Sequence, residues 1–141
     1  MIKGLYPFGL NHYRSLKFQK LRKLISKNQK KIKVEGAYGS SLSFLLIDIF
    51  SSINHQIFYI SNSKETASYV YSDIIELIGE KNCSFLPSNY RSDTKKIKDE
   101  SNIINRSKTI RDILDKETKI IVTYPEAIFE KIPDDKEIDS K

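Results

Sequence analysis

The chain has 141 residues, of which 39% are apolar and 30% are charged, and its net charge is +6. This length and composition favour one globular domain over a disordered chain, and no apolar stretch reaches the ~20 residues that span a bilayer. The N-terminus lacks the pattern of a secretion signal and Cys83 is the only cysteine, so we expect a cytoplasmic protein with no disulfide, no metal and no membrane partner.

Positive charge is concentrated at the start of the chain. Residues 1–34 hold ten Lys and Arg and no Asp or Glu, whereas the remaining residues carry a net charge of −4. Leu21, Leu24 and Ile25 recur at helical spacing, which predicts an amphipathic helix over 15–30. Two interpretations of the charge stay open, namely the solvated face of this helix or attraction to polyanions such as nucleic acid. The candidate nucleic-acid residues are Lys17, Lys20, Arg22, Lys23, Lys27, Lys30 and Lys31, together with Arg91, which follows Tyr90 in a polar loop.

Strand and helix patterns alternate after this basic arm. A short strand is predicted over 32–36, and a helix follows over 43–53 that is apolar on almost every side and should therefore be buried. The β-branched and aromatic run over 56–61 predicts a second strand. Asn62 and Glu65 then resemble a capping box, and the helix that they open is expected to end at Gly79.

The second half of the chain continues the alternation. A third strand is expected over 83–87, followed by a polar connection and a helix over 99–115. The face of this helix that we expect to be buried carries Ile103, Ile104, Ser107, Ile110 and Leu114. The continuous apolar run over 119–124 is typical of a buried parallel strand, and Pro125 opens a short helix over 126–132.

This order predicts an α/β fold with a parallel sheet, helices on both faces and right-handed crossovers. Three parts follow from it: a basic arm and helix over 1–31, an α/β domain over 32–132, and a polar tail over 133–141. The first turn from strand to helix carries two glycines, and phosphate ligands in such sheets bind at a turn of this kind.

That turn resembles a phosphate-binding loop of the form G-x-x-x-x-G-K-[ST] with its central residues changed. Ser41 replaces the second glycine and Leu42 replaces the lysine, which removes the cation that would contact the β- and γ-phosphates. The predicted relic loop comprises Gly36, Gly39, Ser40, Ser41, Leu42 and Ser43. We therefore expect this loop to form a turn that shapes the fold and to bind no nucleotide. Ser43 is expected to help cap the next helix.

No other residue completes a nucleotide site in this sequence. The run that ends in Asp48 mimics a magnesium-binding strand, but it lies inside the predicted helix, and the strand over 119–124 ends without an aspartate. We therefore predict no catalytic residue and no cofactor in this chain, with Asp48 near the exposed edge of its helix and Cys83 as a buried, inert thiol. A phosphotransferase would need Lys64 or Lys108 to supply the missing cation.

Four segments in this order resemble one known family. They are GAYGSSLSFLL, ISNSKETASYVYSDIIELIGE, SFLPSNYR and KIIVTYPEAIFEKI, and together they are similar to the N-terminal UvrB-like module of the bacterial transcription–repair coupling factor (Mfd). The resemblance covers about residues 15–131. Its most specific parts are the loop without a lysine and the last segment, since the others are general features of helicase-like domains.

The resemblance implies a partial RecA-like, helicase-type domain that has lost its nucleotide site. In the family, ATP and magnesium belong to a separate translocase motor that displaces stalled RNA polymerase from double-stranded DNA, and the full protein recruits UvrA for nucleotide excision repair. By this resemblance the chain is a non-catalytic module whose partners are other domains of the same protein. The family continues well beyond the position of Lys141, so we expect this chain to be a fragment or a truncated product. The alternative that we keep is a small basic α/β module that binds nucleic acid.

Overall fold

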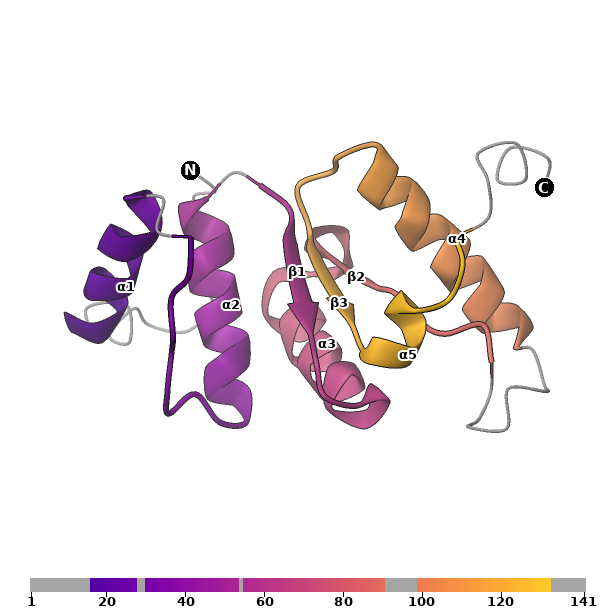
Figure 1. Ribbon diagram of the computed structural model, residues 1–141, viewed down its shortest axis with the longest axis horizontal. Helices are drawn as coiled ribbons and strands as arrows, with labels where there is room; N and C mark the ends of the chain where they lie inside the picture. Colours follow the sequence, from indigo (N-terminus) through magenta and orange to yellow (C-terminus); the bar gives the residue numbers. More distant parts are fainter. Residues whose placement is uncertain (1–15, 28–29, 54, 91–98, 133–141) are drawn as a thin grey trace.

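The computed structural model describes residues 16–27, 30–53, 55–90 and 99–132. Within them the chain forms an α/β fold, in which three strands make one open sheet and helices pack around it (Figure 1). The strands are β1 (Ile57–Ile60), β2 (Cys83–Phe85) and β3 (Ile120–Thr123), and the helices are α1 (Leu16–Ser26), α2 (Ser40–Ser52), α3 (Lys64–Ile78), α4 (Glu100–Leu114) and α5 (Pro125–Ile128).

All three strands are parallel, as predicted, and their order is β1-β3-β2. Ile120 at the start of β3 is in register with Ile57 on one side and Cys83 on the other. Every residue of β3 is buried, which confirms the prediction that its continuous apolar run forms a strand covered on both faces. The chain thus passes from β1 through α3 to β2 without placing these two strands side by side. After α4 it returns to the sheet as β3, which lies between them.

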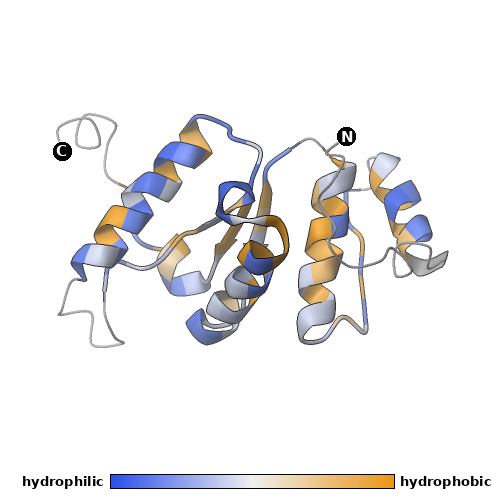
Figure 2. Ribbon diagram, turned by 180° about the vertical axis from the view of Figure 1, so that it is seen from behind, coloured by the Kyte–Doolittle hydropathy of each residue, from blue (hydrophilic) through white to orange (hydrophobic). Residues whose placement is uncertain are grey.

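Successive residues of β3 face opposite sides of the sheet, so the core has two parts. Ile120 and Val122 belong to the larger part, where α2 and α3 pack, while Ile121 packs with Leu86 and Ile110 of α4 on the other face. Figure 2 shows hydrophobic residues along most of α2, which supports its prediction as a buried helix. Helices therefore lie on both faces of the sheet.

The predicted strand over 32–36 is wrong, because this segment has no regular secondary structure and no strand partner. In Figure 1 it lies beside α2, at the end of the molecule away from the sheet. Lys33 and Glu35 alternate with Ile32 and Val34 in this segment, and Val34 is also exposed, so neither face of it is buried. Lys33 and Glu35 instead form an ion pair in solvent. The loop after this segment is consequently not a turn from a sheet strand into a helix.

Two helix starts differ from the predictions by a few residues. The helix predicted over 43–53 begins earlier, at Ser40, with Gly39 as its N-cap. The N-cap of α3 is Ser63 and not Asn62, since the Ser63 hydroxyl accepts the backbone N–H of Thr66. The predicted end of α3 at Gly79 is confirmed, because this residue has a φ of 82°, a conformation that favours glycine.

The predicted buried face of α4 is largely wrong. Ile104, Ser107 and Leu114 are exposed, and the buried residues of the helix are Arg106, Thr109, Ile110 and Asp112. Polar side chains thus turn toward the sheet, where each of them has partners on another element. The helix is positioned by polar contacts as much as by apolar packing.

Candidate functional site

The relic loop forms a tight turn whose polar groups bond to one another. Gly36 and Gly39 have φ values of 84° and 53°, which side chains with a Cβ rarely adopt. The Ser41 hydroxyl accepts the backbone N–H of Tyr38 at 2.8 Å and donates to the Tyr38 carbonyl at 2.6 Å. The backbone N–H groups of Ser41 and Leu42 donate to the carbonyls of Tyr38 and Gly39. Three N–H groups of the kind that would cradle a phosphate are therefore bonded within the turn.

The last two residues of the loop face the interior. Leu42, at the position of the missing lysine, packs against the core formed by α2, α3 and the sheet. Ser43 is fully buried and donates from its hydroxyl to Oδ2 of Asp73 in α3 at 3.1 Å. Ser43 thus joins two helices, and the prediction that it helps to cap α2 is wrong, since that cap makes no side-chain hydrogen bond.

Asp48 is more buried than the sequence predicted. Its side chain has no exposed area and forms two hydrogen bonds to Arg22, through Nε at 3.1 Å and through Nη2. Arg22 of α1 had been a candidate for phosphate contacts, but its guanidinium is used to neutralise this buried carboxylate. The pair instead fixes α1 against α2.

The remaining candidate nucleic-acid residues include five exposed lysines. Lys20, Lys23, Lys27, Lys30 and Lys31 are exposed on or next to α1. Lys17 lies in α1, and Arg91 lies outside the described residues. The exposed lysines agree with both interpretations of the basic arm, a solvated helix face and a surface that attracts polyanions.

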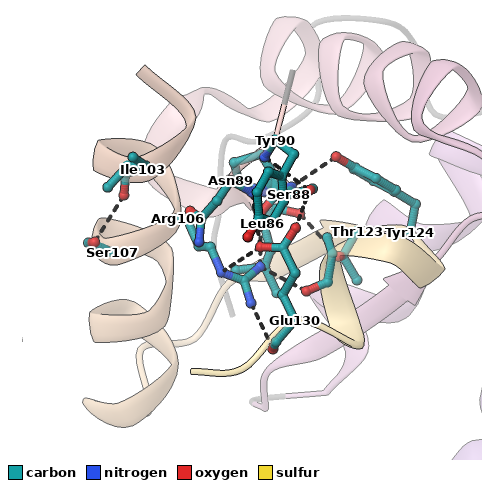
Figure 3. Close-up of polar contacts among 12 residues, drawn as sticks. Leu86, Ser88, Asn89, Tyr90, Ile103, Arg106, Ser107, Thr123, Tyr124 and Glu130 are labelled. Carbon is teal, nitrogen blue, oxygen red and sulfur yellow. Dashed lines mark hydrogen bonds and ion pairs between the residues drawn. The ribbon is translucent and has the colours of Figure 1, made fainter. Parts of the chain in front are cut away.

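A polar cluster that the sequence did not reveal lies at the carboxyl ends of β2 and β3, with Arg106 of α4 at its centre (Figure 3). Arg106 is 2% exposed. Its Nη1 donates to the carbonyls of Pro87 at 2.9 Å and Ala127 at 2.8 Å, and its Nη2 donates to the carbonyl of Glu130 at 3.2 Å. One guanidinium thus joins the chain after β2 to the chain after β3.

The carboxylate of Glu130 completes this cluster. It accepts hydrogen bonds from the Ser88 hydroxyl and from the backbone N–H of Asn89, the latter at 3.0 Å. The Nε of Arg106 lies 3.8 Å from Oε2 of Glu130, which is an ion pair but too long for a hydrogen bond. In the described part of the chain, Arg106 Nε is the buried side-chain nitrogen that lacks a hydrogen-bond partner.

Tyr124, the residue after β3, contacts the chain segment that follows β2. Its hydroxyl oxygen accepts the backbone N–H of Ser88 at 2.9 Å. Burial raises the pKa of Tyr124 above 10.0, and this outweighs the opposing effects of the Ser88 hydrogen bond and the positive charge of Arg106. Burial also lowers the pKa of Arg106, while the nearby Glu130 acts in the opposite direction. Burial thus favours the neutral form of both side chains.

A second polar cluster lies near the amino ends of the strands. Asp112 of α4 accepts the Ser84 hydroxyl at 2.7 Å and pairs with Lys119 at 2.9 Å. Burial acts to raise the pKa of Asp112, but the hydrogen bonds from Lys119 and Ser84 outweigh it and the pKa is lowered. This cluster fixes α4 to the start of the sheet.

Cys83 behaves as the sequence predicted for a buried thiol. It is the first residue of β2 and is almost fully buried in the larger part of the core. Burial raises the pKa of Cys83 to about 12, so the reactive thiolate is scarce at neutral pH.

The described residues contain neither a metal-binding group of side chains nor a membrane-spanning helix. No group of three or more His, Cys, Asp or Glu side chains in this part of the chain is arranged to hold a metal ion. Among the described helices, none is long and apolar enough to cross a membrane.

Comparison with known proteins gives no family for this chain. No protein-family model matches it, and no curated protein matches its sequence significantly.

Proposed function

We propose that this chain is a non-catalytic scaffold module that has lost a nucleotide site. The observation that supports this most directly is the position of Leu42. Its side chain is partly buried and packs against the core, where a phosphate-binding loop would direct a lysine toward the ligand. The internal hydrogen bonds of Tyr38, Ser41 and Leu42 add to this, because they occupy N–H groups that a phosphate would need.

For the wider role, we propose an N-terminal module related to that of transcription–repair coupling factors. This rests on the order of the four sequence segments, and the parallel α/β fold is compatible with the RecA-like ancestry that the resemblance implies. The module would act in transcription-coupled nucleotide excision DNA repair by contacting other domains of the same protein. In the full-length protein, ATP and magnesium would be bound by a separate motor, with UvrA, RNA polymerase and double-stranded DNA as partners.

A titration with labelled ATP and magnesium tests the non-catalytic part of the proposal. We expect no saturable binding below 1 mM, on the order of the millimolar limit of weak ligand affinities. The Leu42→Lys variant should not gain binding, because the N–H groups of the turn stay bonded to one another, and it should unfold more easily than the wild type because it loses the apolar contact with the core. Leu42→Met is the matched control, since it keeps the apolar contact. Sub-millimolar binding by the wild type, or by Leu42→Lys, would contradict the proposal.

The repair role needs a separate experiment in cells. Deleting the gene that encodes this chain should slow the removal of ultraviolet lesions from the transcribed strand and leave the other strand unaffected. Equal repair of both strands before and after the deletion would contradict the role in transcription-coupled repair, while leaving the absence of ATP binding standing.

The exposed lysines of the basic arm support a second candidate function, a nucleic-acid-binding module. The affinity for a DNA duplex should then fall steeply with salt, because each phosphate contact releases counterions. Removing residues 1–31 should abolish binding. Affinity that is unchanged after this deletion would exclude the arm as the binding surface.

A further inference from the structure

The Arg106 cluster occupies the place where open α/β sheets bind ligands. Such ligands lie beyond the carboxyl ends of the strands, between neighbouring strands whose chains continue to opposite faces of the sheet. Here β2 continues toward α4 on one face, whereas α5, which follows β3, buries Ala127 in the core on the other face. The gap between these two chain segments is filled by the side chains of Arg106 and Glu130 (Figure 3).

The groups that surround the Glu130 carboxylate are arranged as donors for an oxyanion. The Ser88 hydroxyl and the backbone N–H of Asn89 both donate to it, and the positive charge of Arg106 lies beside it. Two hydrogen bonds and a guanidinium that converge on two oxygens are the contacts used for bound carboxylates and phosphates. The cluster thus has the chemistry of an anion site, with an internal carboxylate in the ligand position.

The fit of Glu130 in this site is incomplete. Arg106 Nε faces the carboxylate but is 3.8 Å from its nearer oxygen, and this buried N–H has no acceptor among the described residues. A buried donor without an acceptor is costly, because its interaction with water has been lost and not replaced. A ligand oxygen placed closer to Nε would satisfy this donor, which Glu130 does not.

Glu130 also lies on a segment that can move without opening the core. It follows the short helix α5, and its neighbour Phe129 is 87% exposed, while Lys131 and Ile132 are exposed as well. Few apolar contacts therefore hold residues 129–132, and the polar contacts of Glu130 are what attach them. Arg106 in contrast is fixed by the carbonyls of Pro87 and Ala127, so the donors remain when Glu130 leaves.

We propose that Arg106, the Ser88 hydroxyl and the Asn89 N–H form an oxyanion-binding site that Glu130 occupies in this structure. Its ligand is the phosphate or carboxylate group of a small molecule, which displaces Glu130. Arg106 and Ser88 are both buried, so an internal phosphodiester of nucleic acid, flanked by sugars on both sides, does not reach them. This site is independent of the proposed scaffold role and of the relic loop.

The experiment compares Glu130→Ala with Glu126→Ala. Both variants lose one negative charge from the same segment, but Glu126 is exposed in the first turn of α5, whereas Glu130 forms the ion pair with Arg106. The melting temperature of each variant and of the wild type is measured with increasing inorganic phosphate or acetate, with chloride keeping the ionic strength constant. A ligand that binds only the folded state raises this temperature.

We expect phosphate, acetate or both to raise the melting temperature of Glu130→Ala by much more than they raise the melting temperatures of Glu126→Ala and the wild type. Removing the internal competitor should tighten binding by about 10- to 100-fold, the factor that corresponds to one charged hydrogen bond. Adding Ser88→Ala to Glu130→Ala should remove most of this response. The anion that acts more strongly identifies the ligand class.

Equal responses of Glu130→Ala and Glu126→Ala would overturn the proposal, and so would stabilisation by duplex DNA but by neither small anion. If Glu130→Ala does not fold, the wild type gives the second measurement. Titration with phosphate and acetate should then shift the Asn89 amide and Arg106 Nε–H resonances saturably, and resonances that stay unchanged with both anions would overturn the proposal.

Discussion

At the scale of single residues, charged side chains join elements that the hydrophobic pattern alone would not connect. Asp48 has no exposed area, and a carboxylate in that position is tolerated only because Arg22 neutralises it and donates two hydrogen bonds. The same argument applies to Arg106, whose guanidinium binds three backbone carbonyls and lies beside Glu130. Both arginines have structural partners, although Arg106 is buried whereas the Arg22 side chain is 38% exposed.

The pair between Arg22 and Asp48 gives a prediction about stability. Arg22→Ala should lower the free energy of unfolding by about 3 kcal/mol, because it leaves a buried carboxylate without a counter-charge. Replacing both residues with alanine should recover part of this loss, since no unpaired charge then remains. Urea unfolding of the two single variants and the double variant measures the coupling.

Lys20→Ala is the matched control for this cycle. It removes a cation from an exposed position of the same helix and should change stability by less than about 0.5 kcal/mol. If Arg22→Ala and Lys20→Ala have equal effects on unfolding, the ion pair does not contribute to the stability of the fold.

At the scale of elements, the sequence predicted those whose signal is local and apolar. The predictions agree with the structure for the strands β1, β2 and β3, whose residues are largely β-branched or aromatic. They also agree for the apolar helix α2 and for the end of α3, where Gly79 adopts a positive φ. The strand prediction over 32–36 failed because strand propensity cannot show whether a segment reaches a partner strand, and this segment lies beside α2. No described strand pairs with it, although the outer edge of β1 is unpaired among the described residues.

The polar clusters around Arg106 and Asp112 show a second limit of prediction from the sequence. Arg106 and Asp112 occur in α4 at positions that a hydrophobic pattern assigns to solvent, because periodicity counts apolar residues only. Their partners Glu130 and Lys119 are distant in the chain or lie in loops, so no spacing rule connects them. The relic loop was found because its pattern is contiguous, although the contact of Leu42 with the core was revealed only by the structure.

The edge of the sheet at β1 gives a prediction at this scale. Among the described residues, β1 pairs with β3 only, and Phe58 and Ile60 on its outer face are 49% and 56% exposed. An unpaired strand edge with exposed apolar side chains favours association between molecules. Ile60→Lys should therefore reduce self-association at high concentration without lowering the melting temperature, as measured by light scattering and thermal unfolding.

A substitution on the other face of the same strand provides the comparison. Tyr59 packs against the core, so Tyr59→Lys should lower the melting temperature. Light scattering that is the same for Ile60→Lys and the wild type would mean that the edge at β1 does not mediate association.

At the scale of the whole molecule, several buried titratable groups couple folding to pH in the same direction. The pKa values of Cys83, Tyr71 and Tyr124 are raised by burial, and for Cys83 the value is about 12 instead of 9.0. Burial acts to lower the pKa of Lys119, but its hydrogen bonds to Glu117 and Asp112 outweigh this and raise it above 10.5. All four groups hold their protons more firmly in the folded chain than in the unfolded chain.

These pKa values predict that the fold loses stability in alkali. A group whose pKa is raised by folding stabilises the fold fully below its unfolded pKa, and this contribution is lost as the pH rises toward its folded pKa. The loss should begin near pH 9.0, where unfolded Cys83 ionises, and steepen above pH 10.0 and 10.5 as the tyrosines and Lys119 contribute. Each group adds at most about 1.4 kcal/mol per pH unit to the slope.

Asp112 predicts the opposite dependence in acid. Its pKa is lowered below 3.8 in the folded chain, so its contribution is present above that pH and is lost as the pH falls through the folded value. Urea unfolding between pH 2 and 11 should thus show a plateau of stability between about pH 5 and 8. Cys83→Ala should flatten the decline between pH 9 and 10, where the thiol acts before the tyrosines, and a slope that is identical with and without the thiol would show that its burial does not couple folding to pH.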